Sequence, residues 1–477
     1  MAVLSRFRWS IRLATILTLM ALIPSLAFAA SANASSSPQH ESLVQMSSDP
    51  FTNSNSQHAT EVEPDVYSYG QTVVATFQQG RFSTGGASDN GWATSHDGGK
   101  TWVHGSLPDL TIYSGGKAYH RASDPVVVYD ARHKTWIISS YIFDEIANPN
   151  AVAVSLSKDD GLTWSKPVII VQNSTGIFFD KDWITCDNTP SSPYYGHCYD
   201  QWDTFINNKQ YNLIQVSTST DGGLTWSKPA TTADKANGTG GQPVVQPDGR
   251  VIIPILGETP KIYYVASFIS TNGGKSWSKL IKVSFQKVLP EEPRMRTNYG
   301  DPTAAIDSSG KVYLIWNDCR FEKGCTANDL VMTTSTDGLT WTPVARIPID
   351  PIGSGVDHFN PAIAARTFNG STHLALTYYY FPDTNCSVST CKLDVGFISS
   401  TDGGKTWQNK EQLAGPMKLD WLAKTTRGYF AGDYIGTTIL PDDDALPVIE
   451  VATPPSGGLL HEATYTTPED ALSLSGV

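Results

Sequence analysis

The sequence predicts an all-β protein, a β-propeller of seven four-stranded antiparallel blades, with six blades as the alternative. Three observations support this prediction. A short motif with Asp, Gly and Trp occurs six times, short apolar strands begin at intervals of roughly 60 residues, and glycine is abundant while charge is low. Of the 477 residues, 39 are glycine and 17% are charged, as expected for a fold with many tight turns. Four-stranded blades repeated around an axis form a propeller.

The N-terminus predicts secretion. Three arginines within the first 12 residues precede an apolar run from Leu13 to Leu26, and Ala27-Phe28-Ala29 has the small-x-small pattern of a cleavage site. The run is shorter than the roughly 20 residues that a membrane anchor needs. We therefore expect a signal peptide over 1–29, a flexible linker rich in Ser, Asn and Gln over 30–60, and a single propeller domain over 61–477.

Charge and cysteine content agree with an extracellular protein. The net charge of -12, with no basic stripe to offset it, argues against a nucleic-acid partner. The six cysteines form three close pairs, which predict local disulfides in an oxidising compartment. No CxxC or HxxxH spacing supports the alternative, metal binding. The expected pairs are Cys186 with Cys198, Cys319 with Cys325, and Cys386 with Cys391.

The recurrent motif has the pattern S-x-D-x-G-x-T-W. Its copies are Ser95 to Trp102, Ser157 to Trp164, Ser219 to Trp226, Ser270 to Trp277, Ser335 to Trp341 and Ser400 to Trp407. In such a hairpin turn the Asp carboxylate accepts backbone N–H bonds, the glycines adopt positive φ, and the Trp packs between neighbouring sheets. We therefore predict a structural role for all six copies and no catalytic one.

A second repeat places polar residues at the start of seven short apolar strands. We call these residues the openers; they are Glu63, Asp124, Asp182, Gln242, Asp301, Asn360 and Asp433. Because strands alternate in direction and the first strand of a blade lines the axis, we expect these residues to meet at one end of the axis, opposite the Trp-bearing turns. The last unit lacks the motif, and we expect a strand near Leu43 to Met46 to complete it.

In the second unit the alternation of apolar and polar residues predicts four strands. They are Pro125 to Asp130, Thr135 to Phe143, Ala151 to Ser157 and Thr163 to Val171.

The six motif copies resemble the Asp-box (BNR) repeats of bacterial and viral sialidases. The resemblance implies a secreted glycoside hydrolase of the exo-α-sialidase kind that acts on extracellular glycans. In that family an arginine cluster holds the substrate carboxylate, a Tyr activated by a Glu attacks the anomeric carbon, and an Asp serves as general acid. One departure concerns Glu63, which stands where the family has its first arginine.

The resemblance and the ring of openers suggest specific site residues. Tyr434 opens the last unit much as the family's nucleophilic Tyr region does, so it is the nucleophile candidate, with Asp433 or Glu450 as its helper; the alternative is an aromatic packing residue. Asp124 and Asp182 are the acid candidates, since crowded carboxylates raise a pKa. The candidate substrate-binding residues are Arg81, Arg121, Arg294, Arg296, Arg320, Glu63, Asp301 and Trp183. Further aromatic candidates for a sugar-stacking surface are Tyr299 and Tyr378.

Two alternatives stay open at this stage. The sequence has no nucleotide, flavin or haem motif, so no cofactor is expected, but converging carboxylates also suit Ca²⁺. A non-catalytic propeller that binds a glycan or a protein partner is the alternative to a hydrolase, and it requires no arginine at position 63.

Overall fold

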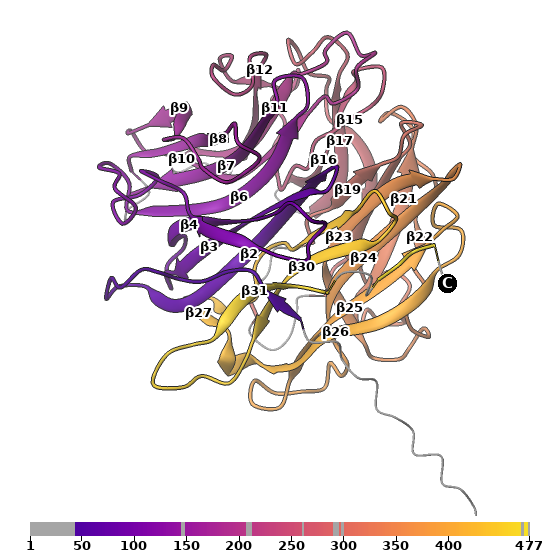
Figure 1. Cartoon of the computed structure of the whole chain (residues 1–477). Coiled ribbons are helices and arrows are strands. Elements are labelled where there is room, and N and C mark those ends of the chain that lie inside the picture. The colour runs from indigo at the N-terminus through magenta and orange to yellow at the C-terminus, as the bar shows by residue number, and fades with distance from the viewer. Residues whose placement is uncertain are drawn as a thin grey trace, which may run out of the picture. The chain divides into compact units, whose positions relative to one another are not determined.

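The computed structural model describes residues 43–144, 148–206, 212–259, 262–289, 295–296, 300–468 and 472–475. Within these ranges the regular elements are strands, apart from one 3-10 turn, η1 (Leu419–Trp421), so the predicted all-β class is confirmed. The same ranges hold no helix that is long and apolar enough to span a membrane. Figure 1 shows strand groups following one another along the chain.

Consecutive strands pair antiparallel in sets of about four. The first set is β2 (Gln57–Tyr69), β3 (Thr72–Arg81), β4 (Ala87–Ser95) and β5 (Val103–Ser106). The second set is β6 (Arg121–Asp130), β7 (Thr135–Phe143), β8 (Asn150–Ser157) and β9 (Val168–Asn173). The third set is β10 (Ile177–Cys186), β11 (Cys198–Ile206), β12 (Asn212–Ser219) and β13 (Ala230–Thr231).

In the fourth set, β14 (Gly238–Thr239) and β15 (Val244–Val245) both pair with β16 (Val251–Thr259), which is followed by β17 (Ile262–Ser270) and β18 (Ile281–Phe285). The fifth set is β19 (Thr303–Ile306), β20 (Val312–Asp318), β21 (Asp329–Ser335) and β22 (Ala345–Arg346). The sixth set is β23 (Asp357–Phe368), β24 (Ser371–Phe381), β25 (Lys392–Ser400) and β26 (Gln408–Lys418). A hairpin, β27 (Ala423–Thr425) and β28 (Gly428–Phe430), precedes the last set.

The last set combines both ends of the chain. It contains β29 (Gly436–Ile439), β30 (Ala445–Ala452) and β31 (Glu462–Thr466), and β1 (Val44–Gln45) pairs antiparallel with β31. The predicted strand near Leu43 to Met46 is therefore present. Met46 is fully buried, so from residue 43 onward the segment expected to be a flexible linker packs on the sheets, because its apolar side chains find a place in the core.

The second set tests the strand prediction directly. The structure has β7 over the predicted Thr135–Phe143. The first strand, β6, starts at Arg121, before the predicted Pro125, and the fourth, β9, starts at Val168, after the predicted Thr163. The late start of β9 follows Pro167, which has no N–H group to donate to a neighbouring strand.

The Asp-box turns are held by side-chain hydrogen bonds, as predicted. In the first copy, Asp97 Oδ1 accepts hydrogen bonds from Ser95 Oγ (2.7 Å) and from the Thr101 amide (3.0 Å). The indole nitrogen of Trp102 donates to the Gly99 carbonyl (2.9 Å). The motif therefore fixes the turn between the third and fourth strands.

The first strands of the sets lie next to one another. In chain order β2, β6, β10, β15, β19, β23 and β29 each contact the next, and β29 contacts β2. They jointly line a cavity of about 390 Å³, to which residues such as Asp65, Val127, Ile184, Thr303 and Ile435 contribute. Hydrogen bonds also link the last, first and second sets into one twelve-stranded sheet.

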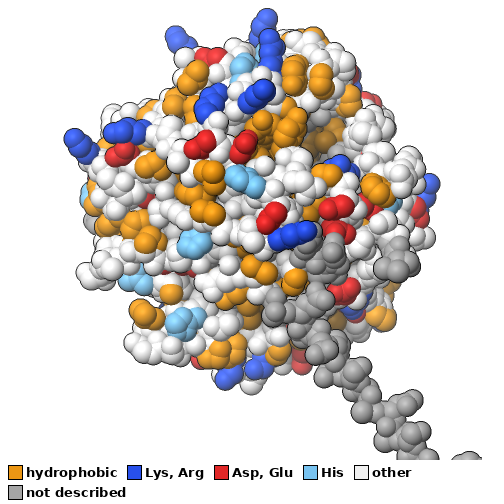
Figure 2. Space-filling model, viewed as in Figure 1, with side chains coloured by type: hydrophobic (Ala, Val, Ile, Leu, Met, Phe, Trp, Pro, Cys, Tyr) orange, Lys and Arg blue, Asp and Glu red, His pale blue; other side chains and the backbone are white. Residues whose placement is uncertain are grey.

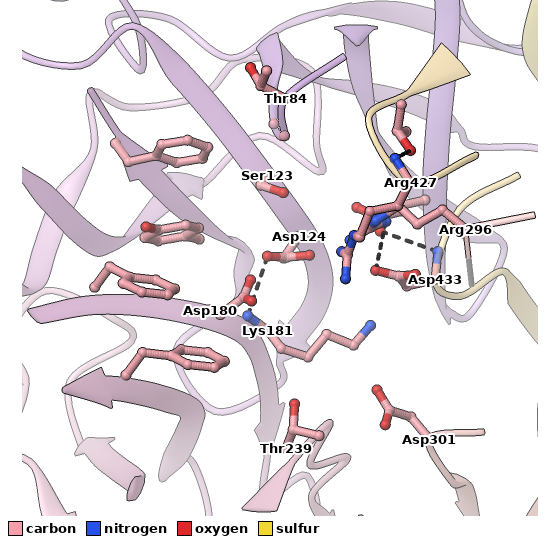
Figure 3. Close-up of a pocket in the computed structure, with 18 of the residues that line it drawn as sticks. Thr84, Ser123, Asp124, Asp180, Lys181, Thr239, Arg296, Asp301, Arg427 and Asp433 are labelled. Atoms are coloured by element: carbon pink, nitrogen blue, oxygen red, sulfur yellow. Dashed lines mark hydrogen bonds and ion pairs between the residues drawn. The ribbon is translucent and has the colours of Figure 1, made fainter. Parts of the chain in front are cut away.

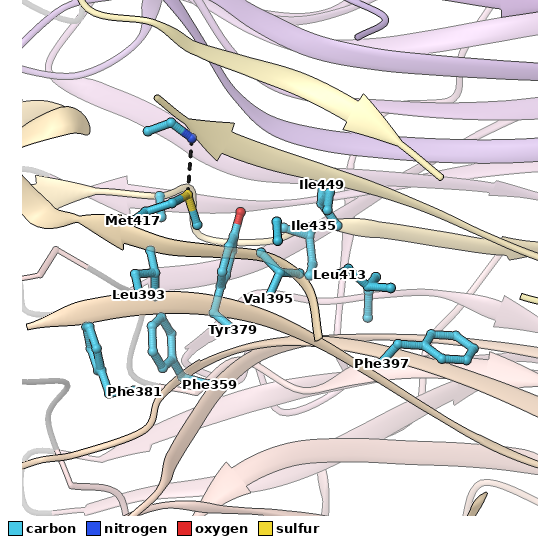
Figure 4. Packing of buried hydrophobic residues seen from close by; sticks show 14 of the residues in the cluster. Phe359, Tyr379, Phe381, Leu393, Val395, Phe397, Leu413, Met417, Ile435 and Ile449 are labelled. Carbon is cyan, nitrogen blue, oxygen red and sulfur yellow. Dashed lines mark hydrogen bonds between the residues drawn. The ribbon is translucent and has the colours of Figure 1, made fainter. Parts of the chain in front are cut away.

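Apolar side chains fill the space between the sixth and last sets (Figure 4). Phe359, Tyr379, Val395 and Ile449 are all fully buried there.

The three expected disulfides are also present, between Cys186 and Cys198, Cys319 and Cys325, and Cys386 and Cys391, with Cα separations of 4.0, 4.9 and 4.9 Å. On the face seen in Figure 2, acidic, basic and hydrophobic side chains are interspersed.

Candidate active site

A cavity of about 480 Å³ lies at the start of the first strands, where it is lined mainly by charged and aromatic side chains (Figure 3). The charged side chains are Glu63, Arg81, Asp124, Asp180, Lys181, Glu258, Arg296, Asp301, Arg427 and Asp433. Four of the openers therefore meet at this cavity, as the repeat predicts. They are Glu63, Asp124, Asp301 and Asp433.

Bulges in the first strands orient three of the cavity-lining side chains, those of Glu63, Asp124 and Lys181. In β2, β6, β10 and β23 the pairing register shifts at the opener. At these shifts Glu63, Asp124, Lys181 and Asn360 have positive φ angles of 54°, 49°, 53° and 44°. Non-glycine residues rarely adopt this conformation, and bulges re-aim side chains near active sites. Three of these four residues, Glu63, Asp124 and Lys181, line the cavity.

Three arginines from different sets meet at the cavity. The guanidinium carbons of Arg81 and Arg296 lie 4.5 and 4.3 Å from the ring centroid of Phe430, which is fully buried. Arg296 Nη1 lies 3.0 Å from Asp433 Oδ2. Arg427 lies between β27 and β28. This hairpin belongs to the longer interval between Asn360 and Asp433 in the sequence, so the extra residues of that interval build part of the site.

The carboxyl groups of the cavity differ in their ionisation. Burial raises the pKa of Glu63 to about 8, that of Asp124 to about 7 and that of Asp301 to about 6. Burial also opposes ionisation of Asp433, but Arg296 and Lys181 outweigh it and lower the pKa of Asp433 below its usual value. One cavity therefore holds a carboxylate that stays ionised beside carboxyl groups that retain a proton near neutral pH.

Glu63 supports the backbone around Asp433. Its Oε1 accepts a hydrogen bond from the Asp433 amide (3.2 Å), and its Oε2 accepts one from the Gln78 side chain. Gln78 in turn accepts a hydrogen bond from Arg81 Nη1 (2.7 Å). Glu63, which replaces the arginine expected from the sialidase resemblance, thus connects the first strand set to the last.

Lys181 is a buried cation of the cavity. Its side chain is only 7% exposed, and within the part of the chain that the structure describes its Nζ has no hydrogen-bond partner. Burial opposes its charge, but Asp301 and Asp124 more than compensate, so its pKa is raised. Figure 3 shows its side chain extending toward the space between Asp301 and Asp433.

Aromatic rings line another part of the cavity. Tyr141 and Phe143 of β7 are stacked with centroids 4.7 Å apart, and Phe178 of β10 stacks on its cross-strand partner Phe205 of β11 at 4.5 Å. Such apolar walls with a few convergent polar groups are typical of ligand sites. Ring stacking also makes this side of the cavity rigid.

Tyr434 does not line the cavity. It is 4% exposed, and its hydroxyl donates a hydrogen bond to the Pro125 carbonyl (3.1 Å). Burial raises the pKa of Tyr434 well above its usual value. Glu450, its expected helper, is also buried, with a raised pKa. The nucleophile role implied by the resemblance stays a prediction, and this geometry does not support it.

The third opener is one residue away from its predicted position. Lys181 has the positive φ that Glu63 and Asp124 have, so Asp182 takes the place that proline holds in those strands. Asp182 instead accepts a hydrogen bond from Ser139 Oγ, which also donates to Asp200. It is therefore not among the residues that line the cavity, and its role as the acid stays a prediction.

Three further expected residues are not part of the lining of this cavity. Arg121 donates to Thr84 Oγ1 (2.7 Å) and to the Gly85 carbonyl (2.8 Å). Arg320 pairs with Asp318 (2.6 Å), and Trp183 lines the other cavity. Each is held by a local partner that spacing along the sequence does not reveal.

The remaining candidates divide into two groups. Gln242 also lines the other cavity, Asn360 donates its side chain to the Gly432 carbonyl (2.7 Å), and Tyr378 is buried in the core. Arg294 and Tyr299 lie outside the described residues.

Sequence reasoning missed Asp180, Lys181 and Arg427. Lys181 was detectable in principle, because it directly precedes the residue that was taken as the opener. Arg427 could not be found from the repeat, because the β27–β28 hairpin that carries it is not part of the repeated strand pattern. Within the described ranges, no group of three or more His, Cys, Asp or Glu side chains is arranged to hold a metal ion.

Comparison with known proteins agrees with this class of fold. Residues 199–378 match the model of a BNR repeat-like domain. The sialidase-like character predicted from the Asp-box copies is thereby confirmed.

Individual relatives are distant. A sialidase of Bacteroides fragilis (strain YCH46) is 23% identical over 286 residues, which are 55% of this chain and 49% of that protein, so the chain spans about half the length of this relative. Among solved structures, a Hadza microbial sialidase is 16% identical with a TM-score of 0.48, over 85% of this chain and 75% of that one. An α-L-arabinofuranosidase of Fusarium graminearum is 14% identical with a TM-score of 0.48, over 90% and 98%.

Proposed function

We propose that the protein is a secreted glycoside hydrolase that cleaves extracellular glycans in the charged cavity. One observation carries the proposal: Asp433 and Asp124 line the same cavity, and their surroundings move their pKa values in opposite directions. Glycoside hydrolysis needs such a pair, one ionised carboxylate and one protonated acid.

We propose the following roles. Asp124 donates its proton to the leaving glycosidic oxygen, because its pKa of about 7 keeps part of the population protonated at neutral pH. Asp433, held ionised by Arg296, stabilises the positive charge that develops at the anomeric carbon. A water molecule attacks this carbon and gives its proton to the Asp124 carboxylate, which restores the acid. Arg81 and Arg427 offer N–H donors to substrate oxygens. This assignment uses paired carboxylates in place of a tyrosine nucleophile.

The seven-bladed propeller and secretion are part of the same proposal. The uninterrupted series of contacts from β2 through β29 and back to β2 supports seven blades around one axis. The three disulfides support an oxidising compartment, as does the sequence of the first 29 residues.

The test is a panel of fluorogenic glycosides that includes sialosides, α-L-arabinofuranosides and neutral hexosides. We expect turnover of at least one by the wild type and a loss of about 10²-fold or more in Asp433→Asn and Asp124→Asn. Asp248→Asn, at an exposed Asp that pairs with Arg250, is the matched control and should retain full activity. If the wild type binds glycans but turns over none, the alternative of a non-catalytic glycan-binding propeller replaces this proposal.

A further inference from the structure

Lys181 and Tyr434 form a buried pair beneath the cavity. The Lys181 Nζ lies 3.9 Å from the centroid of the Tyr434 ring. The ring is fixed from two other sides, since its hydroxyl donates to the Pro125 carbonyl and its edge meets the Trp183 ring at a centroid distance of 5.2 Å. An ammonium over an aromatic face is attracted by the ring quadrupole, most strongly where water is excluded.

We propose that Tyr434 is a positioning residue: its ring holds the ammonium of Lys181 at the cavity, where Lys181 binds an oxygen atom of the glycan. The inference rests on the proposed function, because it assigns the ligand of Lys181 to the same site. In this role the Tyr434 ring contacts the Lys181 ammonium, and the hydroxyl only anchors the ring. A nucleophilic tyrosine would instead react through its hydroxyl.

The surroundings of Lys181 support a ligand role. A buried ammonium without an acceptor is costly, and within the described residues no acceptor reaches the Nζ. The backbone of Lys181 is strained at a φ of 53°, and its amide donates to Asp124 Oδ2 (3.3 Å). A strained conformation persists where the surrounding structure enforces it, often at ligand sites. The bulge in β10 therefore holds the Lys181 side chain at the cavity.

Tyr434 is poorly suited to attack a substrate. Its hydroxyl donates to a backbone carbonyl and burial raises its pKa. Glu63 and Glu450 also have raised pKa values, which favour their protonated forms and so disfavour them as bases. The ring face, in contrast, contacts the Lys181 ammonium. Aromaticity at position 434 is thus expected to matter, and the hydroxyl much less.

The kinetic test compares Tyr434→Phe, Tyr434→Leu and Lys181→Met. We expect Tyr434→Phe to stay within about twofold of the wild type, and Tyr434→Leu and Lys181→Met each to lose about tenfold in kcat/KM, mainly through KM. The double variant Tyr434→Leu/Lys181→Met should lose no more than Lys181→Met alone, because both changes remove one interaction. Tyr69→Leu, at an exposed tyrosine, is the control.

A second measurement does not depend on turnover. In protein with ¹³C-labelled lysine, the ring current should displace the side-chain resonance of Lys181, which is identified by its absence in Lys181→Met. The displacement should persist in Tyr434→Phe and vanish in Tyr434→Leu. If Tyr434→Phe abolishes turnover while the resonance is unchanged, or if Tyr434→Leu leaves the resonance in place, the inference is overturned. If the resonance behaves as expected but no glycoside is cleaved, only the proposed function fails.

Discussion

Arg296 Nη1 lies 3.0 Å from Asp433 Oδ2, and the Arg296 guanidinium also stacks on Phe430. The ion pair joins Arg296, which lies between β18 and β19, to Asp433, the opener of the last set. Because both partners are largely buried, solvent screens their interaction weakly, and the pair controls the charge of Asp433.

Replacing Arg296 by Gln should raise the pKa of Asp433. The acidic limb of the kcat/KM profile should then move to higher pH, because Asp433 becomes protonated more easily without the neighbouring guanidinium. The measurement is a pH–rate profile of both proteins. Arg346→Gln, which breaks the Arg346–Asp329 pair (2.7 Å) outside the cavity, should leave that limb in place. An acidic limb that does not move in Arg296→Gln argues against Asp433 as the ionised partner.

Asp124→Asn should impair leaving-group protonation specifically. Asn tolerates the positive φ at this position, so the backbone is expected to keep its conformation. We expect a loss of about 10²- to 10⁴-fold for substrates with poor leaving groups and a much smaller loss for activated aryl glycosides. Steady-state kinetics on a leaving-group series measures this, and equal losses across the series would exclude Asp124 as the acid.

Stability should fall as the pH rises from about 4.5 to about 8. Burial raises the pKa of Glu61 to about 8 and that of Glu462 to about 7, both where the two chain ends meet. A raised folded-state pKa contributes stability that is present at pH values below the unfolded pKa and is lost as pH rises through the folded one. Urea unfolding between pH 5 and 9 should therefore show a stability that declines from the acidic end of this range and levels off above about pH 8, with a smaller decline in Glu61→Gln. A midpoint that increases over this range would contradict the assignment.

Asp402→Ala tests the structural role of the Asp-box. The Asp402 carboxylate accepts hydrogen bonds from the Thr406 amide (2.9 Å), the Thr406 hydroxyl (2.7 Å) and Ser400 (2.9 Å). Their loss should destabilise the fold by about 1 to 2 kcal/mol. Thermal unfolding should show a lower Tm, while kcat/KM of the folded protein should equal that of the wild type. A selective loss of activity without a change in Tm would assign the turn a functional role.

The repeats made the fold and part of the site predictable. Periodic strands and turns located β7 and the pairing of β1, and the openers Glu63, Asp124, Asp301 and Asp433 do meet. The repeat could not place Lys181, because a bulge shifts the cavity-facing residue by one position and spacing alone does not locate a bulge.

The sequence pattern could not predict side chains whose hydrogen-bond or ion-pair partners lie far away along the chain. The direction of an arginine side chain depends on which acceptor lies nearest in space. Arg121 donates to Thr84 and Gly85, Arg320 pairs with Asp318, and Arg296 reaches Asp433. The resemblance to sialidases suggested Tyr434 as a nucleophile. The structure instead engages its hydroxyl with the backbone, a contact between residues 125 and 434 that no local pattern reveals.

The pH dependence of kcat/KM in the wild type and in Asp124→Asn tests the central claim most directly. Paired carboxylates of opposite ionisation predict a bell-shaped wild-type profile, with a basic limb near pH 7 set by Asp124 and an acidic limb below the usual pKa of Asp set by Asp433. Asp124→Asn should lose the basic limb and keep the acidic one. A basic limb that persists unchanged in the variant would contradict the claim.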